Sequence, residues 1–413
     1  MKRLRRLRRY MTSVKNRTSI KKRIAVIAAN TANNIALPVY SLLFSLIVIR
    51  FCSDMLWGQF VSVLLGVNLG AHFLTWGNKE YLLRSFSLHP AQAESKWRQN
   101  IFTRALLLVL VPLIWVVSPV GMKVFLIIAF WIVAKFIYQS YEVIIVYKNK
   151  FTTTLVLESM GILVVSAIIL TDPTIRLARL LCVAAGADAI KSLLVAFCFR
   201  RLFSLKMKGI TLDFKIFTQA FPFFLLGFTG LLQSRMDQLV VNFYLPGKEI
   251  ARYQVYVNFL LYLQAGSGFL LIPFVKNIYR LPFKTIKRIS LRLFAASVLL
   301  VPMGMGVVYS IVTFLYKLNV SFPQLIIGGL FALPIFYYSP LIYFLFKQGR
   351  QYEVIIIIVS GIAINLVAAL FLIPVYGITG PLLGAMLSQW MMMSLFYYRT
   401  NYSDPGKGQS AVY

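Results

Sequence analysis

Ionisable side chains lie inside long apolar stretches of this sequence, at spacings that place them on single helix faces. Lys135, Gln139 and Glu142 follow one another at i, i+4 and i+7, so on a helix they form one polar stripe. Asp188 and Lys191 are three residues apart and share a face in the same way. Because charges inside a membrane are costly, such residues tend to face a hydrated cavity or one another. They are therefore candidate site residues.

Basic groups near the middle of apolar segments predict an anion site. Ammonium and guanidinium groups can bind phosphate oxygens through charge-assisted hydrogen bonds. Uncharged amides near them would suit sugar hydroxyls. The candidate substrate-binding residues are Lys135, Lys191, Arg235, Gln139 and Asn33.

Acidic groups in the same segments suggest ion coupling, because a carboxylate beside an anion site would be misplaced for anion binding alone. Its protonation can change as a cavity opens to each side of the membrane. The candidates are Glu142, Glu158, Asp188 and Asp237. Coupling to protons or sodium ions is therefore expected, and no other cofactor.

A structural alternative stands beside each of these roles. Asp188 and Lys191 could be a pair that only neutralises buried charge. Glu142 and Glu158 could likewise be structural partners of Lys135 or of lysines in loops. Arg104 lies near the cytoplasmic end of a predicted span, and we expect its long side chain to extend to the lipid headgroups.

Composition indicates what kind of protein carries these residues. Of 413 residues, 59% are apolar and 13% charged, with a mean hydropathy of +0.76; soluble domains are typically about 45–50% apolar and about 25% charged. The net charge of +31 would suggest nucleic acid, but no soluble domain is evident to carry a basic patch. Three cysteines and two histidines lack the spacing of a disulfide framework or a zinc site. The chain is predicted to be a polytopic membrane protein.

Apolar stretches of the length needed to cross a bilayer, roughly 20 residues, occur twelve times. Most lysines and arginines fall in the first 23 residues and in every second connection, which predicts that both termini are cytoplasmic. The predicted spans are 24–49, 57–77, 101–118, 123–147, 152–170, 178–199, 218–243, 253–275, 292–316, 324–346, 354–376 and 378–398.

The domain organisation follows from these spans. A basic head at 1–23 precedes two six-helix bundles, at 24–205 and 206–398, and a cytoplasmic tail at 399–413. Alternating arginine and leucine in the head favour an anchor to anionic lipids over a nucleic-acid site. Every predicted external connection is short and the internal connection 78–100 is too small to fold alone, so we expect no enzymatic domain.

Three short motifs carry a resemblance to a known family. Residues 371–380, FLIPVYGITG, with Asn365-Leu366 before them, resemble the last helix hairpin of polysaccharide transporters in the multidrug/oligosaccharidyl-lipid/polysaccharide exporter superfamily. Residues 74–84, LTWGNKEYLLR, and 235–238, RMDQ, are similar to segments of Wzx-like O-antigen flippases. One departure is Pro381-Leu382-Leu383, which stands where that family usually has small residues.

The resemblance implies an all-α fold in which two six-helix bundles form a V-shaped central cavity. It also implies a flippase of the inner (cytoplasmic) membrane that moves a polyprenyl-pyrophosphate-linked oligosaccharide to the outer leaflet by alternating access. The glycan would be an O-antigen (lipopolysaccharide), capsule or exopolysaccharide repeat unit. A polymerase or chain-length protein of the same pathway could be a partner.

Two alternatives are weighed against this interpretation. A cation-coupled multidrug exporter of the same fold would have a cavity dominated by acids and aromatic residues, whereas here basic residues reach the middle of spans. A membrane-embedded glycosyltransferase or polymerase would require a long external loop or a cytoplasmic acidic motif, and the sequence has neither. The flippase is therefore the leading hypothesis.

Overall fold

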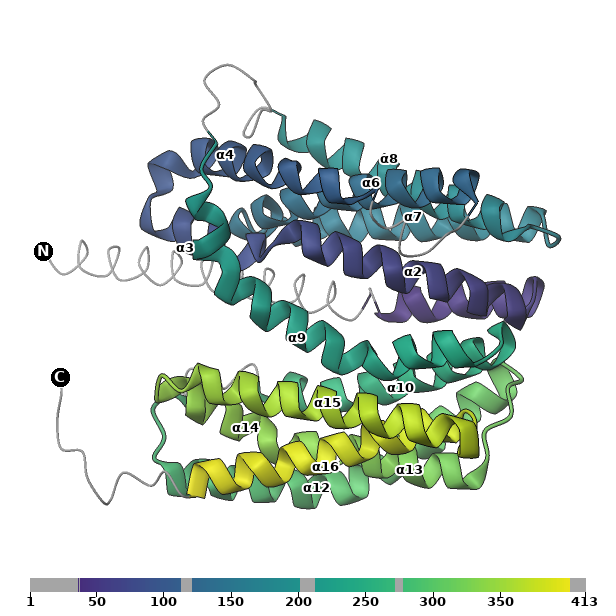
Figure 1. Ribbon diagram of the computed structural model, residues 1–413, viewed down its shortest axis with the longest axis vertical. Coiled ribbons are helices and arrows are strands. Elements are labelled where there is room, and N and C mark those ends of the chain that lie inside the picture. The colour runs from purple at the N-terminus through teal and green to yellow at the C-terminus, as the bar shows by residue number, and fades with distance from the viewer. Residues whose placement is uncertain (1–35, 37, 113–120, 201–211, 272–277, 402–413) are drawn as a thin grey trace, which may run out of the picture. The chain divides into compact units, whose positions relative to one another are not determined.

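The computed structural model describes residue 36 and residues 38–112, 121–200, 212–271 and 278–401 (Figure 1). Within these residues the structure is helical and contains no strand. The head 1–23, the candidate Asn33, most of the tail and the predicted bundle boundary at 205/206 lie outside the described residues.

The chain folds into two compact units, each packed mainly within itself. Unit 1 comprises residues 1–47 and 70–223, and unit 2 comprises residues 48–69 and 224–413. The three divisions fall inside the helix Pro38–Phe51, α2 (Asp54–Thr75) and α9 (Lys215–Tyr244), so each of these helices belongs to both units. The predicted domain boundaries stay predictions.

Unit 1 is built mainly on long apolar helices joined by short turns. α2 and α3 are separated by a break at Trp76 and Gly77, which both have positive φ (46° and 66°), a conformation that ends a regular helix. Trp97 fills the core beside them, since it is fully buried, lies 4.9 Å from the Tyr141 ring centroid and donates to the carbonyl of Ser140 at 2.8 Å. The helices after α2 are α3 (Asn78–Leu88), α4 (Ala93–Ala105), α6 (Met122–Tyr147), α7 (Phe151–Thr171) and α8 (Leu177–Phe199).

Unit 2 has a second core, in which stacked Tyr338 and Phe396 are both buried. A capping box formed by Ser321 and Gln324 begins one of its helices. Gly377, with φ of 53°, ends another. The helices after α9 are α10 (Gly247–Leu271), α12 (Phe283–Ser310), α13 (Phe322–Ala332), α14 (Pro334–Lys347), α15 (Gln351–Tyr376) and α16 (Thr379–Asn401).

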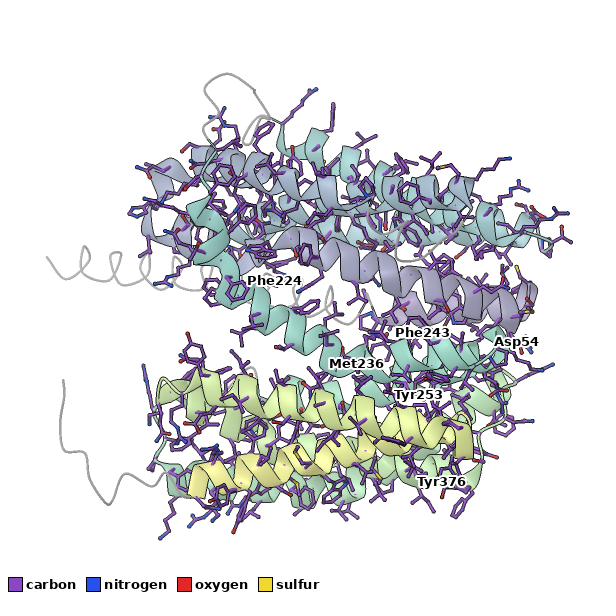
Figure 2. The ribbon with its side chains drawn as sticks, viewed as in Figure 1. Asp54, Phe224, Met236, Phe243, Tyr253 and Tyr376 are labelled. Carbon is purple, nitrogen blue, oxygen red and sulfur yellow. The ribbon has the colours of Figure 1, made fainter. Side chains whose placement is uncertain are left out.

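Eight helical segments of the described chain are long and apolar enough to cross a membrane, and Pro38–Phe51 is a shorter apolar helix. Large apolar side chains cover their outer surfaces, for example Phe243 at 86% exposure and Tyr376 at 56% (Figure 2). The chain is a multi-pass membrane protein, because exposing so many large apolar side chains to water would be unfavourable. The count of twelve spans, the V-shaped cavity and the side of the termini stay predictions.

The segment expected to be a connection, 78–100, is instead largely helical. It contains all of α3 and the first turns of α4, so the helix expected to begin at 101 begins at Ala93. α4 carries four charged residues, Glu94, Lys96, Arg98 and Arg104. A prediction based on long apolar runs therefore misses the beginning of this helix. Its buried face, with Trp97 and Ile101, explains why it is nevertheless a helix packed in unit 1.

Candidate functional site

Four charged side chains from three helices of unit 1 form one connected group, here called the quartet: Lys135 on α6, Glu158 on α7, and Asp188 and Lys191 on α8. Asp188 is its centre, with Oδ1 2.6 Å from Lys191 Nζ and Oδ2 3.4 Å from Lys135 Nζ. Lys191 Nζ lies 2.9 Å from Glu158 Oε2 as well. The structure thus brings together four of the nine predicted site residues.

Uncharged neighbours hold the quartet in place. Trp131 donates its indole N–H to Asp188 Oδ2 at 2.6 Å, and the Lys135 ammonium lies 5.7 Å from the Trp131 ring centroid. Lys191 lies 5.7 Å from the ring of Tyr138. Its aliphatic stem crosses Gly161 on α7, where a Cβ atom would come within 3.3 Å of Lys191 Cδ. Sequence reasoning missed Trp131 and Gly161, although both lie close in sequence to predicted site residues.

The quartet is neutral and partly accessible. Its two ammonium groups balance its two carboxylates, which is the arrangement that the neutralising-pair alternative requires of Asp188 and Lys191. However, between 15% and 22% of each side chain remains exposed, so the charges are not sealed in a dry core. A ligand could reach them and compete for either sign of charge.

The rest of the polar stripe on α6 does not join the quartet through an ion pair. Glu142 Oε1 is instead 2.6 Å from Lys79 Nζ, on α3. Within the described residues, Oε1 of Gln139 is buried and has no hydrogen-bond partner. Glu142 therefore pairs with a lysine of a segment expected to be a connection.

Arg235 and Asp237 belong to unit 2, and they have different partners, as expected for residues two apart on a helix. Arg235 donates to Asn258 Oδ1 at 2.8 Å and to Gln238 Oε1 at 3.0 Å. Asp237, which is 3% exposed, accepts a hydrogen bond from the hydroxyl of Tyr253 on α10. Tyr253 was not among the predicted site residues.

Asp237 lines a polar cavity of about 170 Å³ inside unit 2. Among the described residues, Oδ1 of Asn365, which is 3% exposed, has no hydrogen-bond partner there. Side-chain amides and hydroxyls make this cavity suitable for water or a small cation. The other polar residues of the wall are Gln233, Ser234, Gln264, Ser388 and Gln389.

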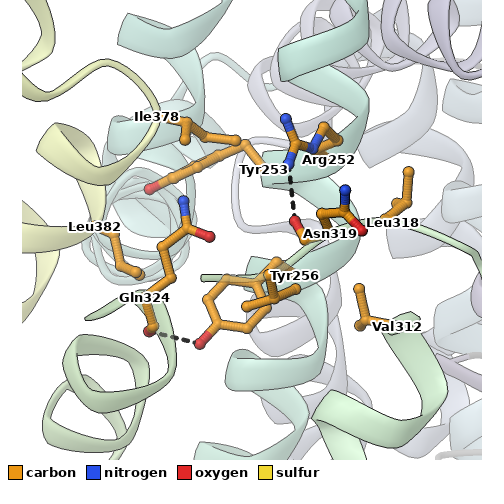
Figure 3. Close-up of a pocket in the computed structure, with 10 residues that line it drawn as sticks. Arg252, Tyr253, Tyr256, Val312, Leu318, Asn319, Gln324, Ile378 and Leu382 are labelled. Carbon is orange, nitrogen blue, oxygen red and sulfur yellow. Dashed lines mark hydrogen bonds between the residues drawn. The ribbon is translucent and has the colours of Figure 1, made fainter. Parts of the chain in front are cut away.

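Tyr253 also contributes to a smaller pocket of about 20 Å³ in unit 2, room for about one water (Figure 3). Figure 3 shows Arg252 donating to the carbonyl of Asn319 and Tyr256 donating to that of Gln324, at 2.8 Å and 2.7 Å. These bonds tie α13 and the connection before it to α10. The pocket is too small for a lipid-linked substrate, so we assign it no part in substrate binding.

Arg104 contradicts the expectation that its side chain extends to the headgroups. It is fully buried, and its Nε donates to Asn100 Oδ1 at 2.8 Å. Its other nitrogens donate to Ser140 Oγ and to the carbonyls of Leu74 and Thr75, at 3.0 to 3.3 Å. The guanidinium thus caps the last turn of α2, where carbonyls lack helical partners. Arg104 is a structural residue of unit 1.

The fold resembles that of known membrane transporters. The chain matches a structure of the lipid II flippase MurJ in an inward closed conformation with a TM-score of 0.67 and 14% identity, over 92% of this chain and 87% of that one. It also matches a multidrug resistance MATE family transporter of the MOP superfamily in two structures. The inward-facing one gives a TM-score of 0.54 and 12% identity over 89% of this chain and 96% of that one. The outward-facing one gives 0.52 and 12% over 93% and 94%.

Comparison with protein-family models finds no match, and comparison with curated sequences finds none either. The identities to the solved structures are low, so the likeness shows the fold alone.

Proposed function

We propose that this protein is a flippase that carries a polyprenyl-pyrophosphate-linked oligosaccharide from the inner to the outer leaflet by alternating access. The observation that carries the proposal is the pair of ammonium groups, Lys135 and Lys191, held inside apolar helices of a flippase-like fold. A diphosphate has several acceptor oxygens and could engage both lysines at once. The glycan would be an O-antigen, capsule or exopolysaccharide unit, and the membrane the inner (cytoplasmic) one.

A cation-coupled multidrug exporter is the second candidate, and the likeness to MATE structures over about nine-tenths of the chain favours it. Carboxylates of the quartet could attract a cationic drug. The quartet carries as many ammonium groups as carboxylates, however, so its field does not select cations. The flippase therefore remains the better proposal, and transport of a cationic dye with indifference to lipid-linked sugars would favour the exporter.

Ion coupling is assigned to the acidic residues. Asp237 is buried beside a polar cavity whose amide and hydroxyl groups could bind a sodium ion, and its carboxylate could instead take up a proton. Glu158 and Asp188 could change protonation within the quartet. Glu142, which pairs with Lys79, is the least suited of the four. Anionic lipids are proposed as contacts of the basic head.

Neutralising the two quartet lysines tests the substrate proposal. In proteoliposomes with a fluorescent polyprenyl-pyrophosphate-linked oligosaccharide, Lys135→Gln with Lys191→Gln is expected to slow flipping by roughly 100-fold. Each lost charge-assisted hydrogen bond is worth about 1.5–3 kcal/mol, or roughly tenfold or more. The rate is followed with a membrane-impermeant quencher that reaches only the outer leaflet.

Two further variants distinguish the loss of the anion site from a loss of folded protein. Lys79→Gln removes a lysine whose partner lies on α6 outside the quartet, and it should retain flipping. Glu158→Gln with Lys191→Gln removes both members of one ion pair, so no charge is left unpaired, and it should still be slow. Normal flipping by the two lysine-deficient variants would refute the anion site.

Replacing Asp237 tests the ion-coupling proposal. Asp237→Asn is expected to abolish any acceleration of flipping by an imposed proton or sodium gradient, because the amide neither titrates nor offers a carboxylate to a cation. Asp54→Asn is the matched control, since this acid lies in unit 2 in a loose pair, 3.9 Å from Lys248. Gradient dependence that persists in Asp237→Asn would exclude Asp237 as the coupling residue.

A further inference from the structure

A phosphate that binds to the quartet must compete with its carboxylates for the two lysines. Asp188 Oδ1 already occupies a donor of Lys191 at 2.6 Å, and Glu158 Oε2 occupies another at 2.9 Å. Lys135 is engaged more loosely, at 3.4 Å from Asp188. Lys191 has three donors in all, two of which already face acids, so a diphosphate that engages both lysines comes next to these carboxylates and weakens their pairing with the lysines.

Competition from a bound anion leaves the two acids in an unfavourable state. A carboxylate within a membrane-spanning segment that loses its ammonium partner bears a large desolvation cost. Taking up a proton removes that charge, and neither carboxylate is fully enclosed, since 17% of the Glu158 side chain and 16% of the Asp188 side chain are exposed. Each uptake forms one O–H bond on the carboxylate with a proton from solvent, and no other bond changes.

We propose that binding of a diphosphate group to Lys135 and Lys191 drives proton uptake by Glu158 and Asp188. This inference rests on the proposed function and specifies how its anion site is coupled. Protons and substrate then enter the quartet from the same side of the membrane and travel together. The coupling is therefore cotransport, and not an exchange of substrate against protons.

We assign the proton uptake to Glu158 and Asp188, and not to the side chains around them. Trp131 donates to Asp188 but is not acidic, and Tyr138 lies under Lys191. On α7, the residue after Glu158 is Ser159, which is hydrogen-bonded to Tyr40 at 2.5 Å. Of the other acids near α6, Glu142 lies 2.6 Å from Lys79 and keeps that partner when the quartet binds an anion. The response is thus assigned to Glu158 and Asp188.

The first test uses the unmodified full chain in detergent, with inorganic pyrophosphate as the probe in titration calorimetry. A simple pair of lysines would bind pyrophosphate more tightly at higher pH, because the probe becomes more negative. A site in which the acids must be protonated is expected to bind it more weakly at higher pH. Stronger binding with rising pH would overturn the proposal.

The second test counts protons, by comparing binding heats in buffers of different ionisation enthalpy. Glu158→Gln and Asp188→Asn should each lower the uptake per pyrophosphate, by up to about one proton. Each should also tighten pyrophosphate binding by about tenfold. The removed carboxylate no longer competes with pyrophosphate for the lysines, and an interaction between neighbouring opposite charges is of about this size. Asp172→Asn is the matched control, since this acid of unit 1 pairs with Arg179 outside the quartet, and it should change neither quantity.

The outcomes separate this inference from the proposed function. No binding of pyrophosphate by the unmodified chain would contradict the anion site itself. Binding with the same proton uptake in all variants, or binding that requires sodium ions and takes up no protons, would contradict the coupling. Because each quartet substitution by itself removes one of the two acids, one folded variant is sufficient to decide.

Discussion

Arg104→Leu is expected to destabilise unit 1 by about 3–5 kcal/mol, the usual cost of breaking a buried, charged hydrogen-bond network. The guanidinium is fully buried and donates to four groups. Leucine would leave the carbonyls of Leu74 and Thr75, the Asn100 amide and the Ser140 hydroxyl without this donor, in a place where no lipid headgroup or bulk water replaces it. The change should appear as a lower melting temperature of the detergent-solubilised protein.

Two other substitutions on α4 serve as comparisons for the change in melting temperature that Arg104→Leu causes. Arg98→Leu removes a basic residue of the same helix whose partner, Glu94, is 3.8 Å away and half exposed, so it should shift the melting temperature little. Arg104→Lys keeps the charge but cannot reproduce the planar fork of donors, so it should fall between the two. Equal melting temperatures for Arg98→Leu and Arg104→Leu would show that the buried network contributes nothing.

The prediction for the Arg104 side chain was wrong because residues that are distant in the sequence form its environment. Near a span end, a basic side chain usually has lipid headgroups within reach, so extension to them was the reasonable expectation. Its partners come instead from α2, about 30 residues earlier, and from α6, 36 residues later. Only the packing of the three helices brings them together, and one sequence does not contain that information.

For the quartet, helical spacing predicted the faces but not the pairs. The i, i+3 spacing of Asp188 and Lys191 correctly placed them together on α8, because this relation depends on one helix alone. Glu158 meets Lys191 only because α7 packs on α8, and Glu142 turns away to Lys79 because residue 79 lies on a helix. Within-helix geometry was therefore predictable and between-helix geometry was not.

Gly58→Ala is expected to open the contact between the first turns of α2 and α10 in unit 2. A Cβ atom on Gly58 would lie 1.8 Å from the carbonyl oxygen of Gly247 and 2.6 Å from its carbonyl carbon. Both are backbone atoms, so no side-chain rotation can relieve the overlap, and the helices must separate. The buried hydrogen bond from Trp57 Nε1 to Gln254 Oε1, 2.9 Å long, lies beside this contact and should be lost with it.

The contact has a consequence for alternating access. Residues 48–69 lie in the predicted N-terminal bundle by sequence, yet they pack as part of unit 2. If the proposed cycle rocks the predicted bundles apart at the external end, this junction must open. Gly58→Ala should therefore favour the state in which it is open.

Cysteine labelling can measure that opening. Ala251 shares the α10 face of Gly247 and Gln254 and is fully buried, so Ala251→Cys is a small change that reports on this face. In a background without Cys52, Cys182 and Cys198, we expect Gly58→Ala to raise its labelling by an impermeant maleimide by about tenfold, corresponding to about 1.4 kcal/mol in the opening equilibrium.

Gly66→Ala provides the matched control on the same helix. A Cβ atom at Gly66 meets nothing within 4 Å, so this change should act only through helix propensity and stabilise α2 by up to about 1 kcal/mol. Labelling of Ala251→Cys should then stay low. Since both variants add one methyl group to α2, a difference between them isolates the overlap with Gly247. Equal labelling would mean that the close approach of the two backbones does not hold this end of unit 2 closed.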